Sequence, residues 1–195
     1  MTTVEPGTRM TLAEYRTLPE TDGGVWELIN GELCQMPSAT AEHQFLMDFL
    51  VRMINNLTTS IQPITGLAFS NLGLALSDLY APTPDIIYLR YENLRLINGN
   101  MVEGIPDLVV EILSSDRNRD LVMKRGLYAG AGVPEYWILD PFNDALTVLE
   151  LSGSEYVERA LGRNDTLATA TIPGFALPLG QLFGNPARAL IRGNR

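Results

Sequence analysis

The spacing of apolar residues along the chain predicts three main helices. From 39 to 58 the apolar residues recur at every third or fourth position, which is the period of an amphipathic helix. A shorter stretch from 11 to 18 shows the same period and begins at a threonine that can cap a helix. A third helix is expected over 119–131, because Gly132 and Pro134 follow it as helix-ending residues.

The strands predicted between these helices begin with a β-hairpin. Residues 25–29 and 32–36 flank Asn30-Gly31, a pair typical of tight hairpin turns. Further strands are expected over 67–76, 85–90, 107–113, 136–139, 145–151, 156–160 and 166–171. This order predicts an α/β fold in which a mixed sheet is flanked by helices.

We expect a single domain spanning 1–195, since no internal repeat or linker interrupts the pattern. Its core is expected over about 26–183, with a short helical turn at 179–183 and a flexible tail over 185–195. Apolar residues make up 46% of the chain and charged residues 19%, which is an ordinary globular composition.

Composition excludes several classes of protein. No apolar run reaches the roughly 18 residues of a membrane-spanning helix, and no signal peptide is recognisable, so we expect a cytoplasmic protein without membrane contact. Cys34 is the only cysteine, which excludes an internal disulfide and a cysteine-rich zinc site. The net charge of −9 argues against a broadly basic nucleic-acid surface, although acidic metal-binding groups also lower the net charge.

The chain contains one lysine, Lys124, and one histidine, His43, whereas the other thirteen basic residues are arginines. A single lysine in such a chain indicates either a compositional bias or a position that requires a compact ammonium group. An exposed ion pair with Asp120, four residues earlier, is the non-functional alternative for Lys124.

Three acidic residues occupy positions in the predicted strands that make them candidates for metal binding or catalysis. Asp85 and Asp107 each follow a proline at a strand start, and Glu111 lies inside an apolar strand, where a carboxylate needs a partner. Asp107 and Glu111 are four strand residues apart, about 13 Å, which is too far to share one Mg²⁺ ion. We therefore pair Asp85 with Glu111 and expect a secondary or structural role for Asp107.

The stretch Pro106–Ser114, followed by Lys124 and by Gly132-Val133-Pro134-Glu135-Tyr136-Trp137, resembles the Uma-type putative restriction endonuclease family. That family belongs to the PD-(D/E)XK nuclease superfamily, and the resemblance extends from about Trp26 to Phe183. It implies a restriction-endonuclease-like core carrying an N-terminal β-hairpin.

The resemblance also implies site residues. The superfamily uses an acid on one strand and a Glu-x-Lys motif on the next; Asp85 and Glu111 match the two acids, but Leu113 occupies the lysine position. The resemblance implies that Lys124 on the following helix replaces that lysine. Asp85, Glu111 and the carbonyl after Glu111 would then hold Mg²⁺ or Mn²⁺.

His43 and Glu32 are secondary candidates, along with Asp107. A histidine near a helix start is most often exposed or packed against the helix, and an acid after a hairpin turn often faces solvent. The family likeness around His43-Gln44 makes His43 a candidate to line the site, and Glu32 is a candidate to face the metal ion.

These features predict a metal-dependent endonuclease that hydrolyses DNA phosphodiester bonds and forms a homodimer. A catalytically degenerate module is the alternative, acting as a nucleic-acid-binding or homodimeric scaffold protein, and the charge of −9 favours it. A third reading is a metal-dependent phosphodiesterase acting on small substrates or RNA.

Overall fold

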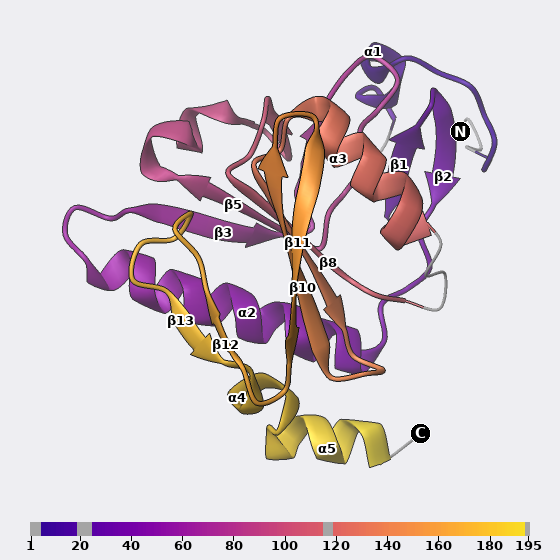
Figure 1. Ribbon diagram of the computed structural model, residues 1–195. Coiled ribbons are helices and arrows are strands. Elements are labelled where there is room, and N and C mark those ends of the chain that lie inside the picture. The colour runs from indigo at the N-terminus through magenta and orange to yellow at the C-terminus, as the bar shows by residue number, and fades with distance from the viewer. Residues whose placement is uncertain (1–4, 19–24, 115–118, 194–195) are drawn as a thin grey trace.

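The protein is described by a computed structural model over residues 5–18, 25–114 and 119–193, the side chains of 119–121 excepted (Figure 1). Its helices are α1 (Leu12–Tyr15), α2 (Ala41–Ser60), α3 (Arg125–Ala131), α4 (Leu179–Phe183) and α5 (Pro186–Gly193). Its strands are β1 (Trp26–Ile29), β2 (Glu32–Gln35), β3 (Gly66–Ser70), β4 (Gly73–Ala75), β5 (Ile86–Arg90), β6 (Ile97–Asn98), β7 (Met101–Glu103), β8 (Leu108–Ile112), β9 (Glu135–Asp140), β10 (Ala145–Ser152), β11 (Glu155–Gly162), β12 (Thr166–Ala168) and β13 (Ala176–Pro178). A 3₁₀ helix spans Tyr91–Leu96, and a π-helical turn at Arg119–Lys124 leads into α3.

A six-stranded mixed sheet forms the centre of the molecule. Its strand order is β11-β10-β9-β8-β5-β3, in which only the β8–β9 pair is parallel. Three smaller sheets accompany it: β1-β2, β12-β13 and β4-β7-β6. The mixed sheet flanked by helices confirms the predicted fold class, including the N-terminal hairpin.

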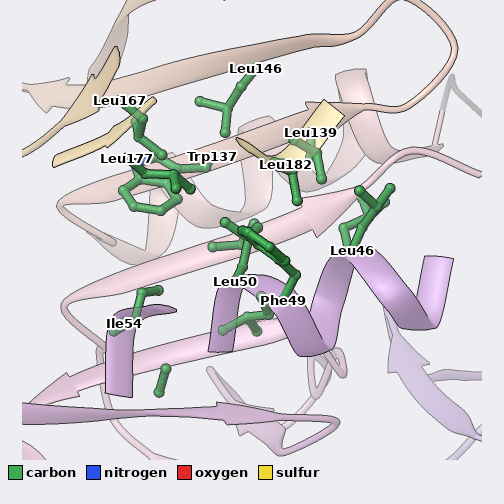
Figure 2. Close-up of a cluster of buried hydrophobic side chains, with 14 of the residues drawn as sticks. Leu46, Phe49, Leu50, Ile54, Trp137, Leu139, Leu146, Leu167, Leu177 and Leu182 are labelled. Atoms are coloured by element: carbon green, nitrogen blue, oxygen red, sulfur yellow. The ribbon is translucent and has the colours of Figure 1, made fainter. Parts of the chain in front are cut away.

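Helix α2 covers one face of the central sheet (Figure 2). Thr40 caps the helix by accepting a hydrogen bond from the backbone N–H of His43 at 3.2 Å. The buried residues of α2 follow its helical period and face strand residues that include Trp137 and Leu139. Burial of this apolar surface holds α2 to the sheet.

Helix α3 belongs to the second apolar cluster, on the opposite face. Successive residues of β5 alternate between the clusters: Ile86 packs on the α2 side, whereas Ile87 packs with Tyr128 of α3. Helix α3 ends at Gly132, whose φ of 85° is the left-handed conformation that favours glycine at a helix C-terminus. On β8, Val109 belongs to the same cluster as Tyr128, and Glu111 follows Val109 by two residues. Glu111 and α3 therefore lie on the same side of β8.

The N-terminal hairpin turns through Asn30 and Gly31, which have φ values of 53° and 69°. These positive angles are those of the turn that Asn-Gly favours. Leu28 of β1 exchanges backbone hydrogen bonds with Ala81 at 3.1 and 2.8 Å. The hairpin is thereby attached to the segment that leads into Pro84 and Asp85.

Two segments differ from the expectations of the sequence. The strand expected over 67–76 is divided into β3 and β4, because Asn71 adopts a left-handed φ of 54° between them. Of the tail expected to be flexible over 185–195, residues 186–193 form helix α5, whose Arg188 is buried, and residues 194–195 lie outside the described part. Within the part of the chain that is described, no helix combines the length and apolar character that crossing a membrane requires.

Candidate active site

Strands β5 and β8 bring Asp85 and Glu111 together. Their antiparallel register pairs Ile86 with Val110, so the next position along each strand places Asp85 across from Glu111. Asp85 Oδ2 accepts a hydrogen bond from the backbone N–H of Ile112 at 2.6 Å. The two carboxylates therefore meet where β5 begins and β8 ends.

Lys124 lies against Glu111 and is almost fully buried, with 1% of its surface exposed. Its Nζ donates a hydrogen bond to Glu111 Oε1 at 2.7 Å and lies 3.3 Å from Glu27 Oε1. The lysine enters from the end of the π-helical turn before α3. The geometry differs from an exposed pair with Asp120, whose side chain lies outside the described residues.

Glu27 is a site residue that the sequence reasoning did not select. It is fully buried, and its Oε1 accepts a hydrogen bond from the backbone N–H of Thr83 at 3.0 Å. Because β1 is hydrogen-bonded to the segment before Asp85, Glu27 on β1 lies beside Lys124. Its signal was available, because Glu27 stands between Trp26 and Leu28 in an apolar strand, just as Glu111 stands between apolar neighbours.

Tyr128 supports Glu111 from α3, one helical turn after Lys124. Its hydroxyl donates to Glu111 Oε1 at 2.7 Å, so the lysine and the tyrosine bind the same oxygen. Two donors described for the Glu111 carboxylate therefore share one of its oxygens. Burial raises the pKa of the Tyr128 hydroxyl well above its usual range, which keeps it a hydrogen-bond donor.

His43 approaches the site from the first turn of α2. Its Nε2 lies 2.8 Å from Asp85 Oδ1, and both side chains are less than one fifth exposed. Asp85 is therefore held on two sides, by the imidazole and by the backbone N–H of Ile112. Asp85 and His43 form the part of the site that solvent reaches, whereas Glu111 and Lys124 lie behind them.

Burial and the neighbouring carboxylates raise the proton affinity of Glu111. Burial raises the pKa of Glu111 from 4.5 to about 8; the Lys124 ammonium opposes this shift, and the charges of Asp85 and Glu27 add to it. Glu111 and Glu27 contact the same ammonium, and Asp85 lies across from Glu111. A cation bound beside Asp85 and Glu111 would favour the ionised form of Glu111.

Asp107 and Glu32 lie apart from these residues. Asp107 Oδ2 accepts hydrogen bonds from the backbone N–H of Arg90 at 2.8 Å and from Asn93 Nδ2 at 2.9 Å. The carboxylate thereby joins β8 to the end of β5 and the 3₁₀ helix that follows. Glu32 is exposed on β2, where its backbone forms a bridge with Arg9.

The donor set suits a hard divalent cation. Mg²⁺ is bound through one or two carboxylates, with water and substrate phosphate completing its shell. Asp85 and Glu111 supply such a pair. In the described ranges, no group of three or more His, Cys, Asp or Glu side chains is arranged to hold a metal ion. Water or substrate oxygens would therefore have to contribute.

Comparisons with known proteins bear on the fold and the family of the chain. A crystal structure described as a putative nuclease belonging to DUF820 from Anabaena variabilis superimposes with a TM-score of 0.74 and 23% identity, covering 90% of this chain and 98% of that one. The likeness shows a shared fold. No curated protein matches the chain. The profile of the Uma2 family, described as "Putative restriction endonuclease", matches residues 12–180. That match covers most of the sequence, and the chain belongs to the Uma2 family.

Proposed function

We propose that the protein is a divalent-metal-dependent endonuclease that hydrolyses DNA phosphodiester bonds at the site formed by Asp85, Glu111 and Lys124. The observation that carries the proposal is the buried contact of 2.7 Å between Lys124 Nζ and Glu111 Oε1, beside a second carboxylate at Asp85. Perturbed, buried ionisable groups of this kind concentrate at functional sites. Membership of the Uma2 family and the shared fold support nuclease chemistry.

Asp85 and Glu111 would hold the cation, Mg²⁺ or Mn²⁺, by their carboxylate oxygens. A divalent ion bound there would polarise a phosphoryl oxygen and lower the pKa of the attacking water. His43 would keep the Asp85 carboxylate in one orientation, and Tyr128 would do the same for Glu111. These two contacts reduce the reorganisation needed when substrate binds.

Lys124 would supply positive charge without changing its position. Its ammonium is anchored by Glu111 and Glu27, so it can orient the attacking water or offset the charge that develops on the phosphoryl group. Burial strengthens such electrostatic effects, because water does not screen them.

The test is cleavage of supercoiled DNA, single-stranded DNA and RNA with Mg²⁺, Mn²⁺ or EDTA. Wild-type protein should cut only with metal, and Glu111→Gln and Asp85→Asn should lose at least roughly 100-fold in rate, the scale of general acid–base and metal-assisted effects. The matched control is Glu158→Gln, which removes an exposed carboxylate paired with Arg125 and should leave cleavage unchanged.

Each outcome has a distinct meaning. Cleavage that persists in Glu111→Gln would place the active site elsewhere. A folded wild-type protein that binds Mn²⁺ in calorimetry but cuts none of the substrates would favour the catalytically degenerate module. Cleavage of RNA alone would correct the substrate.

A homodimer completes the proposal. One described chain offers one such site, and cutting both strands of a duplex requires two cleavage events. Light scattering at working concentration should give twice the mass of 21.5 kDa, and a monomeric mass would remove this part of the proposal.

A further inference from the structure

Helix α5 follows the part of the chain that matches the family profile, which ends at residue 180. In Figure 1 it lies at the C-terminal end of the described chain, below α4. Helices α2 and α5 are in contact. The segment 186–193 therefore lies beyond the residues that match the family profile, and it contacts the helix that carries His43.

Arg188 anchors α5 and is 1% exposed. Its Nε donates to Glu42 Oε1 at 2.9 Å, and its Nη1 donates to Asp144 Oδ1 at 2.8 Å. Nη1 and Nη2 also donate to the carbonyl oxygens of Phe183 and Pro141, at 3.0 and 2.8 Å. The guanidinium thus joins α2, α4 and the β9–β10 turn through three separate nitrogen atoms.

The partly exposed Arg192 adds a second cation to the same acids. Its Nε lies 3.4 Å from Glu42 Oε1, and its Nη1 lies 3.5 Å from Asp144 Oδ1. A buried ion pair contributes little stability compared with apolar packing, but its strict geometry fixes one arrangement of the elements it joins. The Arg188 contacts therefore define where the start of α2 lies.

Glu42 is the residue immediately before His43, and both lie in the first turn of α2. First turns lack part of their backbone hydrogen bonding and open easily unless other contacts hold them. The side chain of Glu42 is held by Arg188, and the imidazole of His43 lies 2.8 Å from Asp85 Oδ1. A shift of this turn would move both contacts together.

We propose that Arg188 is a positioning residue: by holding Glu42, the C-terminal helix fixes the first turn of α2 and with it the orientation of His43 toward Asp85. The activity part of this inference rests on the proposed nuclease function, whereas the structural part does not. Arg188 contacts Glu42, and the next residue along α2, His43, contacts Asp85, so the proposed effect passes through His43.

The single histidine makes the inference measurable, because selective ¹³C,¹⁵N-histidine labelling gives ring signals from His43 alone. At one fixed pH, the folded wild-type protein should show one set of ring signals, with the hydrogen-bonded Nε2 protected from exchange with water. Arg188→Lys and Glu42→Gln should split or broaden these signals and speed the exchange. These two mild substitutions are used because Arg188→Met could prevent folding.

The matched control is Arg163→Met. Arg163 lies 3.6 Å from Asp144, the acid that Arg188 also contacts, but among the described residues it forms no ion pair with Glu42. The His43 signals should stay unchanged in this variant. If Arg188→Lys and Glu42→Gln stay folded and leave the His43 signals as they are in wild type, Arg188 is a structural anchor alone and the inference is overturned.

Activity gives a second readout. Since misplacement by about 1 Å can reduce rates by about 100-fold, Glu42→Gln should lower kcat of DNA cleavage by roughly 10- to 100-fold with KM little changed. In a His43→Gln background the same substitution should cause no further loss, because both act on the orientation of Asp85. Independent, multiplying losses would contradict the inference. Absence of cleavage by wild-type protein would refute the proposed function and leave the histidine signals to decide this inference.

Discussion

Replacing Lys124 by methionine tests whether the buried ammonium holds the site together. Methionine has a similar length and no charge, so the variant removes the cation while largely keeping the volume. The structure gives the ammonium two carboxylate contacts, at 2.7 Å to Glu111 and 3.3 Å to Glu27, and both acids are buried. Removing one partner of a buried ion pair costs about 3–5 kcal/mol, because the remaining charge is uncompensated.

The loss of unfolding free energy in Lys124→Met should depend on pH. Lys124 lowers the pKa of Glu111, which burial still raises to about 8, so Glu111 in the variant should stay protonated over a wider pH range. At pH 6 the protonated Glu111 carries no charge, so Glu27 is the carboxylate left without the ammonium. The loss of unfolding free energy should then approach the lower end of the range, about 3 kcal/mol. At pH 9 the folded variant either carries two buried carboxylates, Glu111 and Glu27, without a cation, or keeps a proton on Glu111 that the unfolded chain has released. Both alternatives cost free energy, so the loss of unfolding free energy should be larger than at pH 6.

Urea unfolding, followed by circular dichroism and by the fluorescence of Trp26 and Trp137, measures the difference. The matched control is Arg125→Met, in the next residue, which breaks an exposed pair with Glu158 and should cost less than about 1 kcal/mol. A loss for Lys124→Met no larger than that of Arg125→Met, or equal at pH 6 and pH 9, would refute the reasoning.

Three further predictions follow from the same contacts. The metal-free protein should lose stability as the pH rises from 4.5 to about 8, since folded Glu111 keeps a proton that the unfolded chain releases; Glu111→Gln should flatten this dependence in urea midpoints. Tyr128→Phe should cost about 1–2 kcal/mol in urea unfolding, because Glu111 loses a buried donor; an unchanged midpoint would contradict the 2.7 Å contact. Asp107→Ala should destabilise by about 1–3 kcal/mol through the lost acceptor for Arg90 N–H, with Mn²⁺ affinity in calorimetry unchanged; weaker Mn²⁺ binding would give Asp107 a role in the site.

The sequence predicted the parts of the site that depend on local signals. Proline before aspartate and the apolar runs after it located the strands, and a carboxylate inside such a run marked Glu111. These cues act over a few residues, so one chain suffices to detect them. Pairing Asp85 with Glu111 needed only one further step, the assumption that the two strands are neighbours; their antiparallel register sets the start of β5 opposite the end of β8.

Glu27 and α5 were missed because their positions depend on distant contacts. Glu27 reaches the site only through the docking of the hairpin on Thr83, a residue 56 positions further along the chain. Helix α5 lacks a long apolar stripe, and its attachment depends on Arg188 meeting Glu42 across 146 residues. Sequence spacing does not identify the partner of Glu27 or of Arg188, because many acidic residues along the chain could pair with that arginine.

The burial of the only lysine has a practical consequence for labelling. Reagents that acylate lysine side chains meet a folded protein whose single ε-amino group is covered by carboxylates and protein surface. Acylation at Lys124, read by mass spectrometry of its peptide, requires the segment around α3 to open. The rate of that reaction therefore reports how often the candidate site is exposed in the native protein, without an introduced probe.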